Sequence, residues 1–196
     1  MKGKRLTLIL LVLGVLLIAG AAGYFVWMRY SISQNAKYAK KTVETLYTLM
    51  PEVSSGALDD RQNAAMSAIE VNGNSFVGII EVPAYESKLP IYAKWDGEKT
   101  VCFPCRYLGS LYNGTLIIGG SDNDGQLDFI GEISIGQTVY ITDTLGVRYA
   151  YSVSSIRRVK DVSTENLCKE KTALTIFAKN SLDFDYTVVY CDVSVK

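Results

Sequence analysis

The chain has 196 residues, which is enough for one domain and an appendage but not for two full domains. Hydrophobic residues make up 48% and charged residues 20%, a balance typical of a folded globular chain and not of a disordered one. The formal net charge is zero and no basic block stands out, which excludes nucleic-acid binding.

Residues 6–28 contain no charged side chain and consist mostly of Leu, Val, Ile, Ala and Gly. As a helix this segment would be roughly 34 Å long, enough to cross a hydrocarbon core of about 30 Å. Tyr24, Trp27 and Tyr30 lie at one end, where aromatic rings favour the membrane–water boundary. The small residues at 19–21 also fit a cleaved signal peptide, but apolar character continues beyond them. We therefore predict an uncleaved transmembrane helix.

Basic residues flank this segment on both sides, so their distribution does not decide its orientation. They are Lys2, Lys4 and Arg5 before it, and Arg29, Lys37, Lys40 and Lys41 after it. Because the tail at 1–5 is short, we predict a single-pass protein with a cytoplasmic N-terminal tail and the bulk of the chain outside.

Residues 31–50 carry apolar side chains at roughly helical spacing and are followed by Pro51, which predicts a second helix. A Ser-Ser-Gly sequence at 54–56 begins a linker. The helix could be a stalk that lifts the following domain off the bilayer, or it could pack across that domain. We assign 29–66 to a helical stalk and linker.

From about residue 68 the pattern changes to short β-rich runs separated by turn residues. The runs are 76–82, 89–95, 115–118, 138–142, 147–156, 173–178 and 186–195. One short helical piece lies near 127–133. These elements predict a mainly β domain over 67–196, a closed β-barrel of seven or eight strands with short helices.

Four cysteines are present, at Cys102, Cys105, Cys168 and Cys191. An even number in an exported domain is compatible with disulfides, and the sequence leaves all three pairings open. The CxxC spacing at 102–105 has no thioredoxin-like pattern around it, which argues against a redox role. Without histidine or a second CxxC, zinc is not expected either. We predict no cofactor and no metal.

A series of short motifs occurs in the order in which class B-type sortases carry them. They are Phe-Val-Gly-Ile-Ile at 76–80, Leu-Pro-Ile at 89–91 before Trp95, Pro-Cys-Arg-Tyr-Leu-Gly-Ser at 104–110, Leu-Ile-Ile-Gly-Gly at 116–120, Gly-Gln-Thr-Val at 136–139, a hairpin at 143–146, Leu-Thr-Ile-Phe at 174–177 and Val-Val-Tyr-Cys at 188–191. From about 71 to 193 the chain therefore resembles the sortase family, class B type. This resemblance implies a sortase-type β-barrel at the cell surface of a Gram-positive bacterium, held outside its membrane.

Sortases are cysteine transpeptidases that use a cysteine, a histidine and an arginine, and the resemblance puts these positions at Lys179, Ser121 and Tyr186. The chain contains no histidine anywhere. We therefore expect no catalytic residues, and we expect the three side chains to converge at one end of a groove. The implied function is that of a catalytically inactive pseudosortase in binding or scaffolding. A sorting-signal-like peptide or a cell-surface protein would be its partner.

An acyl-transfer hydrolase or transpeptidase is the alternative, because a Ser121–Lys179 pair could transfer acyl groups if the lysine were desolvated. Nearby carboxylates would keep that lysine protonated, which is wrong for a general base. They belong to Asp122, Asp124, Asp183 and Asp185. The sequence at 122–125 also resembles the start of a calcium loop, but it lacks the downstream glutamate and is more typical of a turn.

Overall fold

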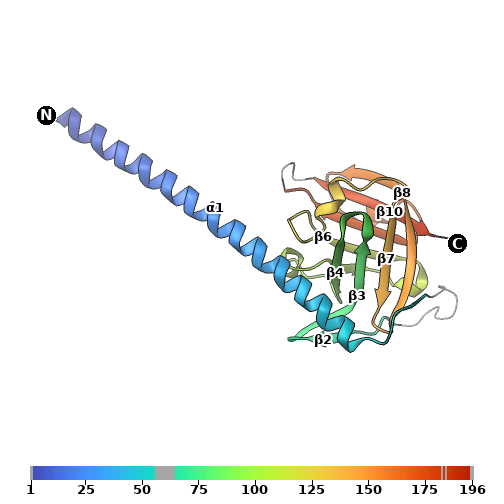
Figure 1. Cartoon of the computed structure of the whole chain (residues 1–196). Helices are drawn as coiled ribbons and strands as arrows, with labels where there is room; N and C mark the ends of the chain where they lie inside the picture. Colours follow the sequence, from blue (N-terminus) through green and yellow to red (C-terminus); the bar gives the residue numbers. More distant parts are fainter. Residues whose placement is uncertain (1, 56–64, 182, 184, 195–196) are drawn as a thin grey trace.

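The structure is a computed structural model of the whole chain, and it describes residues 2–55, 65–181, 183 and 185–194. Residues 56–64 of the predicted linker and residues 195–196 of the predicted domain lie outside this part. One long helix extends from a compact β-domain (Figure 1). The boundary between the transmembrane helix and the stalk at 28/29, and the boundary between the linker and the β-domain at 66/67, stay predictions.

Helix α1 (Lys2–Leu49) joins the two predicted helices into one. Its large apolar side chains between Ile9 and Met28 are exposed. Among the described residues, this is the one helix that is long and apolar enough to cross a membrane. Its last turn closes with the Met50 amide donating to the Leu46 carbonyl at 2.9 Å, and Pro51 then ends the helix because its ring cannot continue it.

The described residues of the β-domain form ten strands and several short helices. The strands are β1 (Ser54–Ser55), β2 (Ile69–Val71), β3 (Asn74–Val82), β4 (Ser87–Tyr92), β5 (Cys105–Leu108), β6 (Leu116–Ser121), β7 (Thr138–Asp143), β8 (Val147–Val159), β9 (Leu174–Lys179) and β10 (Tyr186–Val193). The short helices are η2 (Pro83–Tyr85), η3 (Lys99–Val101), η4 (Leu111–Asn113), η5 (Asp128–Gly131) and α2 (Thr164–Leu167).

Eight of these strands close into a barrel, as the sequence predicted. The hydrogen-bonded order is β3, β4, β5, β6, β9, β10, β8 and β7, and β7 pairs again with β3 to complete the ring. Strands β1 and β2 are added outside this ring, on β8 and β3. Closure leaves no open edge among the eight strands, which removes unpaired backbone groups.

Alternation along each strand separates an interior core from an outer face. In β9, Leu174, Ile176 and Ala178 belong to the main core, whereas Phe177 belongs to a second cluster on the outer face. Lys179, the last residue of β9, is exposed. The alternation therefore gives the outer face of β9 a different chemistry from its inner face.

The C-terminal half of α1 packs across the barrel, which decides between the two roles that the sequence left open. Ala39, Val43, Leu46 and Met50 are buried on one side of the helix, in a cluster with residues of β2, β3 and the segment before β5. Phe76 and Phe103 meet edge to face in this cluster, with ring centroids 5.1 Å apart. The helix and the barrel thus share a core and form one unit.

This packing predicts that Leu46→Ala will lower the free energy of unfolding by about 2–5 kcal/mol, because it removes a fully buried side chain and leaves a cavity. Lys41→Ala, at an exposed position of the same helix, is the matched control and should change stability by no more than about 0.5 kcal/mol. Denaturant unfolding of the detergent-solubilised protein measures both. Equal effects would contradict the packing of α1 on the barrel.

Candidate functional site

Three neighbouring strands bring the residues predicted from the resemblance to one end of the barrel. Ser121 is the last residue of β6 and pairs in register with Lys179, the last residue of β9. Tyr186 is the first residue of β10 and pairs with Lys179 on its other side. The three Cα positions therefore form one row across β6, β9 and β10, and we call Ser121, Lys179 and Tyr186 the row of three. Their equivalence to the catalytic positions of sortases stays a prediction.

The hydroxyl of Ser121 is already engaged with two neighbours. It donates to the Thr100 carbonyl at 3.3 Å and accepts from the Asn123 amide at 3.2 Å. Lys179 is exposed at the end of its strand. A lysine becomes an effective base only where burial withdraws it from water, and this position offers no such burial. The geometry therefore gives no support to acyl transfer by this pair.

Tyr186 belongs to a group of rings on the outer face of the barrel, which we call the aromatic cluster: Trp95, Tyr107, Phe177 and Tyr186. Phe177 lies at its centre, fully buried, with ring centroids 5.7 Å from Trp95, 5.4 Å from Tyr107 and 6.3 Å from Tyr186. Trp95 is 41% exposed. The cluster therefore presents the Trp95 ring to solvent, and Phe177 lies between Trp95 and Tyr186.

Gly119 in β6 makes room for this cluster. A Cβ atom added at Gly119 would overlap the Phe177 ring, so the glycine lets the ring lie flat against β6. Sequence analysis identified Phe177 only as part of a motif and missed its partners Trp95 and Tyr107. Because side chains alternate along β9, the sequence could have predicted that Phe177 and Lys179 lie on the same face of the strand. No local sequence signal predicts that Trp95 packs against Phe177.

The carboxylates near the row have partners of their own. Asp122 accepts from the Ser181 backbone amide and hydroxyl, and Asp185 accepts from the Asn180 side chain. Asp124 pairs with Arg29 of α1 at 3.0 Å, and Asp183 pairs with Arg158 at 3.4 Å. Asp122 thus links the loop after β6 to the loop after β9, and the two ion pairs are exposed and contribute little to stability.

The segment that resembled a calcium loop is a turn in the structure. The Gln126 amide donates to the Asn123 carbonyl at 2.9 Å, and the Gly125 amide donates to Asp128 at 2.9 Å. Across the part of the chain that the structure describes, no three His, Cys, Asp or Glu side chains are grouped so as to hold a metal ion.

A cavity of about 280 Å³ lies on the outer face near the aromatic cluster. Ile117 of β6, Thr175 of β9 and Leu167 of α2 contribute to its walls. Thr175 and Lys179 lie on the same face of β9 four residues apart, a separation of about 13 Å along an extended strand. The outer face of β9 thus carries the cavity, the aromatic cluster and the row of three in succession.

All four cysteines lie in the described part of the chain and are free thiols. Burial raises the pKa of Cys105 to about 12 and that of Cys191 to about 12. Burial also raises the pKa of Cys102. Cys168 is exposed just after α2. Since the thiolate is the nucleophile, the two buried thiols are unsuited to attack a substrate.

Comparison with known proteins gives the fold its name. No family model matches the sequence, and no curated protein does. Among solved structures, Streptococcus pneumoniae sortase C matches with a TM-score of 0.55 at 14% identity, covering 84% of this chain and 89% of that one. Sortase A from Corynebacterium diphtheriae matches with a TM-score of 0.53 at 16% identity, covering 84% and 85%. Sortase C-1 from Actinomyces oris matches with a TM-score of 0.52 at 15% identity, covering 84% and 99%.

The chain therefore has the sortase fold. At these identities the likeness concerns the fold alone. The three structures are sortases of classes A and C, so the class B resemblance that we drew from sequence motifs stays a prediction.

The thiol environments predict distinct reactivities. At pH 8, a short pulse of iodoacetamide should alkylate Cys168 in the folded protein, and Cys105 and Cys191 only after unfolding. Peptide mass spectrometry measures the modified fraction at each site. Because the two folded-state pKa values are raised, only the unfolded chain ionises these thiols above about pH 9, so stability should fall as the pH rises further. Native alkylation of Cys191 as fast as that of Cys168 would contradict this account.

Proposed function

We propose that this protein is a membrane-anchored pseudosortase, a sortase-fold domain that binds a peptide or a cell-surface protein without covalent chemistry. One observation carries the proposal: the chain has no histidine, and Ser121, Lys179 and Tyr186 occupy the row at the end of β6, β9 and β10. A thiolate–imidazolium pair therefore has no counterpart at this end of the barrel.

The typical contributions of the three catalytic groups to a reaction rate show how much each replacement removes. A general acid or base contributes about 10²–10⁴-fold to a rate, so its loss alone could leave residual activity. Loss of the nucleophile removes the covalent intermediate itself. A tyrosine in place of the arginine also removes a positive charge that would stabilise developing negative charge. Together the three replacements favour binding over turnover.

The outer face of β9 supports a binding role. The cavity of about 280 Å³ and the partly exposed Trp95 lie along the same strand. Tryptophan and tyrosine are enriched among the residues that dominate binding energy, because their rings bury a large area at a small entropic cost. An extended peptide that places an apolar side chain in the cavity and contacts Trp95 would fit this face.

The long apolar helix supports a surface location. We place residues 6–28 in the bacterial membrane as a single pass, with 1–5 in the cytoplasm and the barrel outside. The sortase fold and the exposed apolar side chains of α1 support this placement.

The proposal predicts that the full-length protein will not cleave or transfer sorting-signal-type peptides. Lys179→Cys alone should be equally inactive, because Ser121 cannot protonate a leaving amine and Tyr186 supplies no positive charge. A fluorescence-quenched peptide set, separated after the reaction by mass spectrometry, measures turnover.

Binding of the same peptides is measured by fluorescence anisotropy. For any peptide that binds, Trp95→Ala should weaken affinity several-fold, whereas Ile135→Ala, at an exposed apolar position outside the aromatic cluster, should not. Turnover that disappears in Ser121→Ala or Lys179→Ala would instead establish the Ser–Lys alternative. Absence of both binding and turnover would move the docking surface to another face of the barrel.

A further inference from the structure

Helix α1 contacts the loops at the same end of the barrel as the row of three. Arg29 pairs with Asp124 at 3.0 Å, in the loop that follows Ser121. The Asn35 side-chain amide donates to the Val101 carbonyl at 3.3 Å. Val101 follows Thr100, whose carbonyl accepts from the Ser121 hydroxyl. Residues 29–36 of α1 therefore lie against the site end of the barrel.

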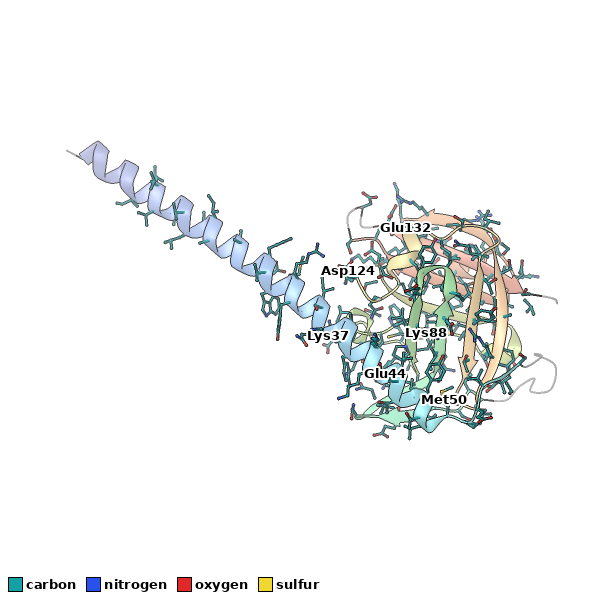
Figure 2. All side chains as sticks on the ribbon, viewed as in Figure 1. Lys37, Glu44, Met50, Lys88, Asp124 and Glu132 are labelled. Atoms are coloured by element: carbon teal, nitrogen blue, oxygen red, sulfur yellow. The ribbon has the colours of Figure 1, made fainter. Side chains whose placement is uncertain are left out.

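The helix then runs along the barrel to its opposite end. Strand β8 spans the barrel, with Val159 pairing with Tyr186 at the site end. At the other end of β8, Val147 pairs with Ser54, a few residues beyond the end of α1. From Arg29 to Met50 the helix rises about 32 Å, which is comparable to the length of the nine-residue strand β3, about 30 Å. Figure 2 shows Asp124 near the exposed part of the helix and Met50 at the far end.

This arrangement fixes the direction in which the site points. The exposed apolar stretch from Ile9 to Met28 ends immediately before Arg29. If this stretch crosses the bilayer, Arg29 lies at the boundary of the hydrocarbon core, and Asp124 lies at the same level. Ser121 is three residues from Asp124, a distance of no more than about 10 Å. The polar headgroup layer on one side of a bilayer is itself about 5–7 Å thick.

The shared core makes this orientation a property of the fold and not of a flexible tether. Leu46 and Ala39 are fully buried between α1 and the barrel. The segment at 29–36 continues the same helix without a break. Rotation of the barrel relative to the membrane would require separation of this interface or a kink in α1.

We propose that the end of the barrel formed by the loop at 122–124 and by Asn180, Ser181, Asp183 and Asp185 is seated on the outer surface of the bilayer, in contact with lipid headgroups. The turn at 143–146 then points away from the membrane. Both signs of charge occur at this end, since Arg29 and Arg158 are each paired with a carboxylate. Zwitterionic phosphatidylcholine is therefore a sufficient partner. The inference rests on the proposed membrane anchor.

The experiment compares two labelled positions in the full-length protein reconstituted in phosphatidylcholine nanodiscs. In a Cys102→Ser/Cys168→Ser background, Asp183→Cys puts an environment-sensitive fluorophore at the site end, and Leu145→Cys puts it at the opposite end. Both side chains are well exposed, at 62% and 44%. Cys105 and Cys191 are buried, so we expect them not to react in the folded protein.

A lipid with a spin label on its headgroup should quench the fluorophore at 183 several-fold more than the fluorophore at 145. Replacement of part of the phosphatidylcholine by an anionic lipid should leave this ratio unchanged. Equal quenching at the two positions, or stronger quenching at 145, would overturn the orientation.

Retention of the protein in vesicles after an alkaline carbonate wash tests the membrane anchor separately from the seating of the barrel end on the bilayer. Retention with equal quenching would leave the anchor in place and reject the seated barrel end. Loss of the protein from the vesicles would reject the anchor, and the seated barrel end with it.

Discussion

The parallel pairing of β6 with β9 is the constraint on which the rest of the site depends. Its register, from Leu116 opposite Leu174 to Ser121 opposite Lys179, joins segments almost 60 residues apart in the sequence. The same register lays Phe177 against Gly119, and β10 adds Tyr186 beside Lys179. A shift of one residue would turn the inward side chains of β9 outward, and the core and the outer face would both be lost.

The sequence predicted the barrel well because most of its strands carry their own periodicity. Strands β3, β7 and β9 alternate or form continuous apolar runs between turn residues, and each was predicted to within two residues. Strand β5 was not predicted as a strand, because four residues beside Pro104 carry too little pattern and become a strand only through pairing with β6. Burial of α1 also depends on tertiary contacts, so the sequence left its role open.

The candidate site also has one part that the sequence predicts and one part that depends on tertiary contacts. Motif spacing was enough to bring Ser121, Lys179 and Tyr186 to one end of the barrel. The aromatic cluster could not be predicted, because Trp95 comes from the loop after β4 and Tyr107 from β5. These rings fill the outer face that leads to the row of three and give it an apolar surface. Both proposals, peptide binding and the seating of this end on the membrane, concern this surface.

The central claim is that this end of the barrel forms no covalent intermediate. Intact-mass measurement tests it most directly, after incubation of the full-length protein with an excess of sorting-signal-type peptides and an added amine nucleophile. The account predicts an unchanged protein mass and unchanged peptides at all times. An acyl adduct that maps to Ser121, Lys179 or Cys168 and is discharged by the amine would contradict it.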